Sequence, residues 1–255
     1  GVNIVIDSGR EKVQRFHIAR KLNQLSEQMI SKASSVQRAG RAGRQQAGFC
    51  YRLWSQEQQQ VLLENSAAQI TEIDLSQTLL TLLEWGSDFS QLPLIDRPNQ
   101  AQINYAFSLL FQLSLVNQEH HISQKGKMAA GFNTHPRLAS LLVGAQDSLE
   151  NNQNTKVITA TLVALIEGKP IDRLVGSNDI VSQCKYILHH LEASKKPVGT
   201  YEYFKDVKRI CGLLNVKPHS NSINILNDED LSNAISTILL RAFPDKVAYQ
   251  RALTS

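Results

Sequence analysis

The amino-acid sequence predicts a mixed, mostly α-helical protein, in which a short α/β segment is followed by helices over most of the chain. A β-branched run at residues 2–7 and an aromatic run at residues 49–54 flank a polar, arginine-rich segment. From about residue 64 onward, apolar residues recur at helical spacing. The 255 residues, 42% hydrophobic and 20% charged, have the composition of soluble globular proteins and can form one large domain or two to three small ones.

The first 63 residues are predicted to contain a strand, a helix and another strand. Val2–Asp7 is typical of a buried parallel strand, and Ser8-Gly9 ends it. A polar stretch follows, with a short strand expected around residues 28–30. Ser34 is predicted to cap a helix that runs through the arginine-rich segment, and residues 49–54 form the next strand. This order of elements indicates the last part of an α/β domain.

Residues 64–132 are predicted to form two helices and a wing. The first helix carries an apolar stripe that ends at Gly86, and the second carries another. The stripes are Leu75, Leu79, Leu82 and Leu83, then Ile103, Phe107, Leu110 and Phe111. Residues 122–126 are interpreted as a small turn or β-wing. Two helices and a wing predict a winged-helix domain.

Residues 133–255 are predicted to form a bundle of five amphipathic helices. The apolar stripes lie at residues 138–145, 158–166, 180–191, 204–214 and, after an acidic start, 228–243. Two of the three cysteines, Cys184 and Cys211, lie within these stripes, so we expect them to pack in a core rather than to react.

The distribution of charge indicates where a polyanion binds. Residues 1–63 carry ten Lys or Arg and four Asp or Glu, a net charge of +6, whereas the remainder carries −2. The basic end is therefore expected to dock a nucleotide or nucleic acid.

The remaining composition excludes several classes of site. The three cysteines are far apart, which argues against disulfides or zinc and suits a reducing cytoplasm. The histidine doublets at 120–121 and 189–190 lack companions at ligand spacing, so no metal site is expected. No apolar run is long enough to span a membrane, and no secretory signal opens the chain. Because a strand follows the first residue at once, we expect a fragment of a longer protein.

The most informative segment is Gln37-Arg38-Ala39-Gly40-Arg41-Ala42-Gly43-Arg44. Wound as a helix, it places Gln37, Arg41 and Arg44 on one face, where two guanidinium forks suit phosphate oxygens. Each glycine costs about 1 kcal/mol in a helix interior, which indicates that another surface approaches the backbone closely. The alternatives are a solvated arginine face and a capping box, Ser34-x-x-Gln37, with a helix N-terminus that could itself attract an anion.

Six positions of this segment match, in order and spacing, motif VI of superfamily-two helicases in its DEAH/RHA form, and the chain resembles that family. Other segments are similar to the same family, and the last of them resembles its bacterial HrpB subgroup. They are residues 5–9, 30–34, 48–53, 72–75, 135–139 and 242–248.

The resemblance implies a domain organisation and a nucleotide-contacting set. Residues 1–63 would be the end of the second RecA-like domain, 64–132 the winged helix, and 133–255 the helicase-associated ratchet bundle. The nucleotide-contacting residues would be Gln37, Arg38, Gly40, Arg41 and Arg44. Gln37 would contact the γ-phosphate of ATP, and Arg41 and Arg44 would be catalytic arginine fingers. Arg38 would contact the nucleotide or form a structural ion pair.

The resemblance also implies partners and limits. The cofactor would be ATP with Mg²⁺, bound mainly by a missing N-terminal RecA-like domain, and the ligand would be single-stranded RNA or DNA, with no membrane involved. Lys125, Lys127 and Arg137 are weak candidates for RNA contact and are otherwise solvated charges. The sequence contains no G-x-x-x-x-G-K-[ST] phosphate loop and no Asp-Glu-x-His. This chain alone is therefore expected to be inactive. The alternative functions are a non-catalytic nucleic-acid-binding or protein-interaction module and a piece of a DNA helicase.

Overall fold

The computed structural model describes residues 2–147, 152–191, 193, 195–218 and 227–248. Contacts divide the chain into two compact units. The first unit consists of residues 1–75 with 88–106, and the second of residues 76–87 with 107–255. The predicted domain boundaries after residues 63 and 132 stay a prediction.

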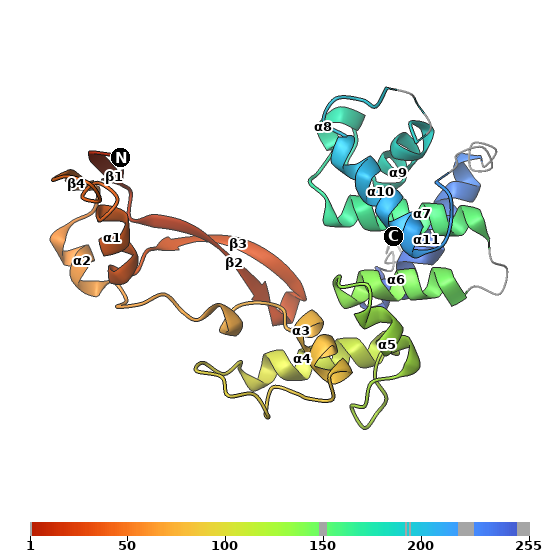
Figure 1. The fold of residues 1–255 in the computed structure, drawn as a ribbon, viewed down its shortest axis with the longest axis horizontal. Helices are drawn as coiled ribbons and strands as arrows, with labels where there is room; N and C mark the ends of the chain where they lie inside the picture. The colour runs from red at the N-terminus through yellow and green to blue at the C-terminus, as the bar shows by residue number, and fades with distance from the viewer. Residues whose placement is uncertain (1, 148–151, 192, 194, 219–226, 249–255) are drawn as a thin grey trace, which may run out of the picture. The chain divides into compact units, whose positions relative to one another are not determined.

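The predicted strand, helix and strand at the N-terminus are present, but the first strand is not buried as predicted, because Ile4 and Ile6 are 55% and 69% exposed. Strand β1 (Ile4–Asp7) pairs in parallel with β4 (Phe49–Arg52), with Ile4 opposite Phe49 and Ile6 opposite Tyr51. Helix α1 (Lys32–Ala39) packs against β1, as Figure 1 shows. The helix is therefore the connection between two parallel strands, as the geometry of parallel pairing requires.

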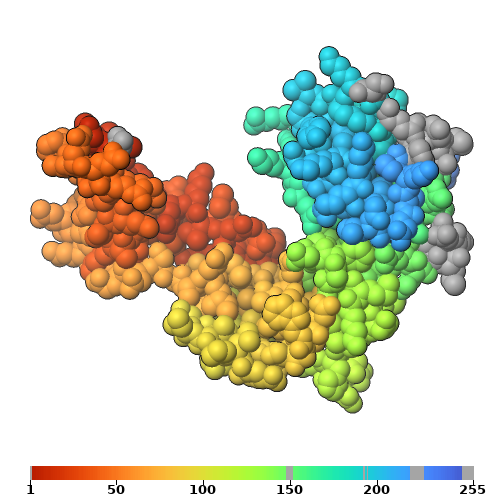
Figure 2. All heavy atoms as spheres, in the orientation of Figure 1, coloured from red at the N-terminus to blue at the C-terminus, as the bar shows by residue number. Residues whose placement is uncertain are grey.

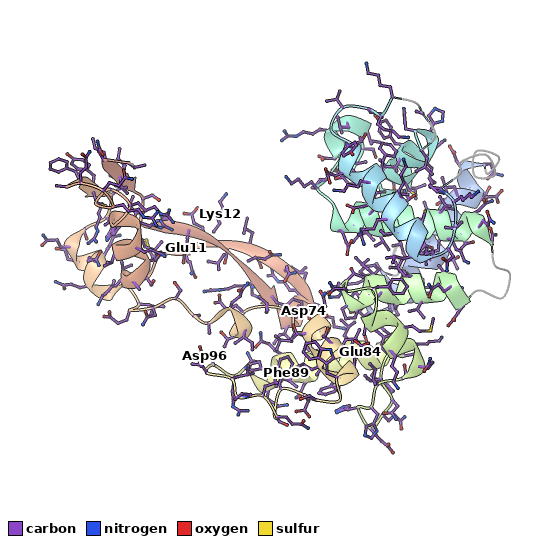
Figure 3. All side chains as sticks on the ribbon, viewed as in Figure 1. Glu11, Lys12, Asp74, Glu84, Phe89 and Asp96 are labelled. Atoms are coloured by element: carbon purple, nitrogen blue, oxygen red, sulfur yellow. The ribbon has the colours of Figure 1, made fainter. Side chains whose placement is uncertain are left out.

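A long β-hairpin forms between residues 10 and 29, in the polar stretch for which the sequence predicted only a short strand. Strand β2 (Arg10–His17) pairs antiparallel with β3 (Leu22–Met29), and the 3₁₀ turn η1 (Ile18–Arg20) joins them. The short strand predicted around residues 28–30 is the end of β3, whereas the rest of β3 and all of β2 were not predicted. Both faces of the hairpin carry polar side chains, so the strands show no alternation of apolar and polar residues. Neighbouring residues Glu11 and Lys12 extend from opposite sides of it (Figure 3).

The segment after β4 contains mostly helices. Helix α2 (Gln56–Val61) begins with a Ser55–Gln58 capping box, and the 3₁₀ turn η2 (Gln69–Thr71) follows. Helices α3 (Ser76–Glu84) and α4 (Gln100–Gln112) form where the two apolar stripes predicted them. The first stripe is confirmed by the buried Leu79 and Leu82, whereas the second was placed partly wrong, since α4 buries Ala106, Leu109 and Leu110 and leaves Phe111 47% exposed. Gly86 has a φ of +76°, which explains why the α3 stripe ends there.

The predicted wing is reduced to a single β-bridge. Val116 and Ile122 form this bridge, and helix α5 (Gln124–Ala130) begins directly afterwards with Ser123 as its N-cap. Placing residues 124–126 in a wing was therefore wrong. Gly126 serves close packing instead of a turn, since a Cβ there would lie 2.1 Å from the carbonyl oxygen of Leu115.

The C-terminal half is a helical bundle, as predicted. Its helices are α6 (Pro136–Asp147), α7 (Gln153–Glu167), α8 (Asp172–Val175), α9 (Ile180–His189), α10 (Tyr201–Leu213) and α11 (Asp228–Ala242), followed by the 3₁₀ turn η3 (Pro244–Lys246). Helix α7 contacts α6, α9, α10 and α11, and it is buried from Lys156 to Leu165. Figure 2 shows these helices, green to blue, as one closely packed mass.

The two cysteines of the bundle lie in its core, as predicted. Cys184 and Cys211 are fully buried. Burial raises the pKa of the Cys184 thiol well above its usual range and raises that of Cys211 to about 11. Because the thiolate is the reactive form, both side chains are inert at neutral pH. None of the described helices is long and apolar enough to cross a membrane.

Arg137 is a buried structural residue, which corrects both expectations for it. Its Nη1 lies 2.6 Å from Asp245 Oδ1 and its Nη2 lies 2.9 Å from Oδ2. Nη1 also donates to the carbonyl oxygen of Ala242 over 2.7 Å, and the guanidinium lies over the ring of Phe243. The two charged side chains are only 6% and 8% exposed. Arg137 is thus neither solvated nor open to RNA, and it fastens α6 to the end of α11.

Arg137→Met should lower the free energy of unfolding by roughly 3–5 kcal/mol, because it leaves the Asp245 carboxylate buried without its cation. The double change Arg137→Met with Asp245→Leu should recover most of that loss. Denaturant unfolding followed by helical circular dichroism measures both. Arg173→Met, at an exposed arginine of the same bundle, is the control. A single Arg137 variant as stable as this control would contradict the assignment.

Candidate nucleotide-contacting site

Helix α1, which carries Gln37 and Arg38, begins three residues earlier than predicted. Its N-cap is the buried Ser31, whose Oγ accepts a hydrogen bond from the backbone N–H of Ser34 over 3.1 Å. Ser34 therefore lies in the first turn, and the predicted Ser34-x-x-Gln37 capping box was wrong. Two serines lie three residues apart here, and the sequence alone did not distinguish them.

The N-terminus of α1 is closed to anions. The N–H groups of Lys32 and Ala33 donate to the carbonyl oxygens of Leu63 and Glu64, over 2.8 and 3.0 Å. The Ser31 hydroxyl takes the next N–H. The groups that would attract a phosphate at a helix N-terminus are thus already used. Any phosphate contact in this segment must come from side chains near the other end of α1.

Helix α1 ends at Ala39, so the predicted continuous helix from Gln37 to Arg44 was wrong. Gly40 is the C-cap, and residues 40–47 form a turn that we name the arginine turn. Glycine is a poor helix former, which is why the helix ends at the first one. The turn continues directly from α1, since the N–H of Arg41 donates to the carbonyl oxygen of Arg38.

The arginine turn is held against the start of β1. Ala42 is buried, and Gln46 Nε2 donates to Asn3 Oδ1 over 2.7 Å. A Cβ at Gly48 would lie 2.2 Å from the carbonyl oxygen of Ala42 and 2.7 Å from that of Asn3. The turn is thus fixed at its middle and at its end, while its arginine side chains remain outside these contacts.

Gln37, Arg41 and Arg44 are exposed and uncommitted. Within the described part of the chain, none of the three side chains makes a hydrogen bond or an ion pair. Two guanidinium groups and an amide on one short segment can together bind several oxygens of a phosphate, because each guanidinium offers a planar fork of donors. The donors of these three side chains are therefore open to a phosphate, as predicted, although the residues do not share one helical face.

Arg38 differs from its neighbours because its side chain is engaged. Its Nη1 donates to Asp7 Oδ1 over 3.0 Å and to the carbonyl oxygen of Arg10 over 3.2 Å. Its Nη2 lies 3.7 Å from Glu11 Oε2. Asp7 is buried at the end of β1. Of the two roles predicted for Arg38, the structure therefore shows the ion pair.

The two glycines of the motif are open to their surroundings. A Cβ at Gly43 would meet no atom of this chain within 4 Å, and one at Gly40 would meet only backbone oxygens of its own helix at 3.5 and 3.6 Å. The close approach predicted for these glycines does not occur within the described residues. It would have to come from a surface outside them.

The β1–β4 pair exposes one apolar face. Ile4, Ile6, Phe49 and Tyr51 lie on the same side of the two strands, and each is more than half exposed. The other side is covered by α1 and carries the buried Asp7. Parallel sheets bury both faces, so a bare apolar face is unusual for this architecture.

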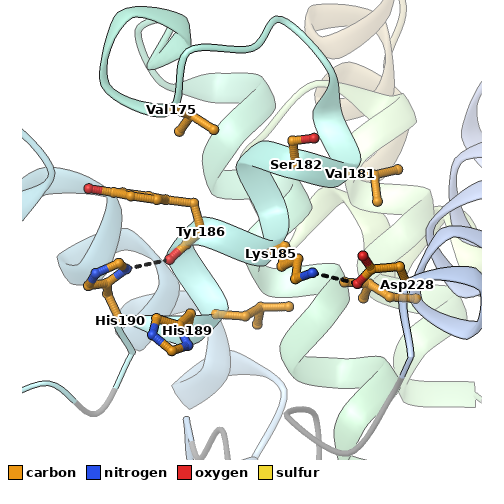
Figure 4. A pocket seen from close by; sticks show the side chains of 10 residues that line it. Val175, Val181, Ser182, Lys185, Tyr186, His189, His190 and Asp228 are labelled. Atoms are coloured by element: carbon orange, nitrogen blue, oxygen red, sulfur yellow. Dashed lines mark hydrogen bonds and ion pairs between the residues drawn. The ribbon is translucent and has the colours of Figure 1, made fainter.

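A cavity of about 690 Å³ in the helical bundle offers a second place to consider. Figure 4 shows two interactions among its lining residues, since Lys185 pairs with Asp228 and the His190 ring bonds the carbonyl oxygen of Tyr186. Among the described residues, no three His, Cys, Asp or Glu side chains gather as they would around a metal ion. The arginine turn therefore offers the stronger site.

Comparisons with known proteins give relatives over nearly the whole chain. No family model matches it. The ATP-dependent RNA helicase HrpB of Escherichia coli strain K12 is 31% identical over 252 residues, which are 98% of this chain and 27% of that protein. The ATP-dependent RNA helicase HrpA of Borreliella burgdorferi is 35% identical over 145 residues, 56% of this chain and 18% of its own length.

Solved structures give the same result. A crystal structure of the E. coli DExH-box NTPase HrpB matches 99% of this chain with a TM-score of 0.75 and 29% identity. A crystal structure described as that of the E. coli DEAH/RHA helicase HrpB matches 98% with a TM-score of 0.79 and 29% identity. The chain belongs to the DEAH/RHA helicase family. It spans about a quarter of the length of HrpB.

The arginine turn of this DEAH/RHA helicase chain allows a matched pair of glycine substitutions. Gly48→Ala should lower the free energy of unfolding by roughly 1–3 kcal/mol, because its Cβ would clash with fixed backbone oxygens. Gly43→Ala should leave it unchanged or raise it by about 0.4–1 kcal/mol, because that position is open and its φ is not positive. Denaturant unfolding followed by Trp54 fluorescence, with Trp85 replaced by Phe, compares them. Equal effects of the two changes would contradict the observed turn.

Proposed function

We propose that this chain is the part of an ATP-dependent RNA helicase that presents Arg41 and Arg44 to the terminal phosphate of ATP. The supporting observation is that, within the described residues, Gln37, Arg41 and Arg44 are exposed and uncommitted beside Arg38, whose side chain is engaged. Their donors are therefore open to a ligand, whereas Arg10, Arg15 and Arg38 of the same unit pair with carboxylates.

Each side chain has a role that follows from its chemistry. Arg41 and Arg44 act as arginine fingers, offsetting the negative charge that builds on the oxygens of the transferred phosphoryl group. Gln37, a neutral donor and acceptor, contacts the γ-phosphate. Gly40 and Gly43 leave the turn without side chains that would hold the nucleotide away. Mg²⁺ binds together with ATP, and its ligands lie with the residues that bind the ATP phosphates, mainly in the N-terminal RecA-like domain.

The ATP itself is held mainly by an N-terminal RecA-like domain outside these 255 residues. The sequence lacks a phosphate loop and an Asp-Glu-x-His, so the chain by itself does not hydrolyse ATP. The exposed apolar face formed by Ile4, Ile6, Phe49 and Tyr51 supports the presence of further structure against β1 and β4. The open space at Gly43 supports the approach of that other domain, or of the nucleotide it holds, to the arginine turn.

The helices after residue 64 handle single-stranded RNA in this proposal, as a winged-helix domain and a ratchet bundle. The relatives are named as RNA helicases, which favours RNA over DNA. Lys125 and Lys127 are exposed and stay candidates for phosphate contact. Arg137 is no longer a candidate, because it is buried against Asp245. The cytoplasm is the expected location.

Arg41→Ala and Arg44→Ala, made in the full-length protein, should each lower RNA-stimulated ATP turnover by about 10³-fold, because each removes charge compensation from the transition state. Affinity for RNA should remain nearly unchanged. Phosphate release and RNA binding, measured on the same preparations, separate the two effects.

The control for this pair is Arg97→Ala, since Arg97 is an exposed arginine of the same unit that lies outside the motif. It should retain normal turnover. If Arg41→Ala and Arg44→Ala behaved like Arg97→Ala, the finger assignment would be lost, and a non-catalytic binding module would be favoured instead.

Binding of single-stranded RNA and DNA of the same sequence, compared across about 50–200 mM salt, should show tighter binding to RNA at every concentration. Phosphate contacts alone produce a steep salt dependence that is similar for both, whereas contacts to the 2′-hydroxyl favour RNA. Fluorescence anisotropy of the full-length protein provides both the slopes and the ratio. Equal affinities throughout would favour a helicase that does not distinguish RNA from DNA.

A further inference from the structure

We propose that Arg38 is a positioning residue that ties the arginine turn to the root of the β2–β3 hairpin, so that the placement of Arg41 and Arg44 depends on the hairpin. This inference rests on the proposed function, because it concerns the same two arginines. It assigns to Arg38 an action through other residues, with no contact to the nucleotide.

The first part of the connection is the pair between Arg38 and Asp7. The carboxylate side chain is 2% exposed, and its Oδ1 accepts hydrogen bonds from Arg38 Nη1 over 3.0 Å and from the N–H of Gly9 over 2.9 Å. Asp7 Oδ2 is buried and has no hydrogen-bond partner among the described residues. A carboxylate buried in this way depends strongly on its cation, so Arg38 is held firmly in place.

The second part runs from Arg38 into the hairpin. Arg38 Nη1 also donates to the carbonyl oxygen of Arg10, the first residue of β2, and Nη2 lies 3.7 Å from Glu11 Oε2. Glu11 Oε1 in turn accepts from Gln28 Nε2 over 3.0 Å, across the pair of strands.

The third part carries the connection along the hairpin. Gln28 Oε1 accepts from Arg15 Nη2 over 2.5 Å. Arg15 Nε lies 2.7 Å from Glu72 Oε1, and the carbonyl oxygen of Glu72 accepts from the N–H of Phe16. An uninterrupted series of polar contacts thus runs from Asp7 through Arg38, Glu11, Gln28 and Arg15 to Glu72.

The main chain completes the connection at the nucleotide end. Arg38 lies between Gln37 and the start of the arginine turn, and its carbonyl oxygen accepts from the N–H of Arg41. Eight residues of β2 pair with eight of β3, and Arg38 is bonded to the carbonyl oxygen of the first residue of β2. A displacement of the hairpin root therefore moves Arg38 and the turn together, and a shift of about 1 Å at a reacting group can change a rate by about 10²-fold.

The test is a double-mutant cycle in the full-length protein, with kcat and KM for ATP measured for Arg38→Met, Asp7→Asn and the double variant. Each single change should lower kcat by about tenfold or more while KM stays within about twofold, because correct placement matters most in the transition state. The double variant should be no worse than Arg38→Met, because both changes break the same connection. Arg97→Met, at the exposed arginine used above, should leave kcat unchanged.

Two results would overturn the positioning role. If Arg38→Met lowered kcat and Asp7→Asn did not, Arg38 would act on the nucleotide directly, because the buried Asp7 cannot. If both variants melted at lower temperature with normal kcat below the transition, the pair would be merely structural. Should Arg38→Met not fold, Arg38→Lys replaces it in the cycle. Lysine keeps a charge near Asp7 without reaching Glu11 as well, and an intermediate kcat is expected.

Gln28→Leu tests the part of the connection that lies in the hairpin. It removes the two hydrogen bonds by which Gln28 bridges Glu11 and Arg15, but it leaves the Arg38–Asp7 and Arg15–Glu72 pairs in place. A severalfold lower kcat with unchanged KM is expected, and a normal kcat would overturn the dependence on the hairpin. A negative result for Arg38 or Gln28 can be told apart from failure of the proposed function. In the first case Arg41→Ala would still lower turnover strongly, and in the second it would not.

Discussion

The ion pair between Arg38 and the buried Asp7 is the interaction on which the basic end of the chain depends. Asp7 closes β1, and the same carboxylate oxygen holds the N–H of Gly9, where φ is +71° and the chain enters the hairpin. Arg38 lies in the last turn of α1. One carboxylate thus joins the end of a strand and the turn that follows it to a helix 31 residues further along the chain. Removing its cation would leave a buried charge without compensation, so the arginine at this position is required by the fold.

Four arginines of this chain illustrate three physical situations. Within the described residues, Arg41 and Arg44 are exposed without partners, Arg38 is partly exposed and paired with a buried acid, and Arg137 is buried with Asp245. Only the first situation leaves the guanidinium free to meet a phosphate from outside. The other two use the same fork of donors to fix one segment of chain to another.

The site is also shaped by what surrounds it. The N-terminus of α1 is occupied by backbone carbonyl groups, and the opposite end carries the arginine turn. A helix C-terminus is the negative end of the helix dipole, so by itself it repels phosphate. In the proposed function, the cationic side chains of Arg41 and Arg44 therefore supply the attraction for phosphate.

The amino-acid sequence alone determined the elements whose apolar residues follow a regular period. The two N-terminal strands, the helices α3 and α4 and the five amphipathic helices of the bundle were all predicted, because burial imposes a pattern that can be read locally. The sequence also indicated Gln37, Arg41 and Arg44 as candidates by residue type and spacing, and their role stays a proposal. Only the tertiary structure decided the hairpin, whose polar side chains pair across strands, and the end of α1 at Ala39. It alone decided the partners of Arg38 and Arg137 as well, because Asp7 and Asp245 lie 31 and 108 residues away, and nothing local in the sequence marks such pairs.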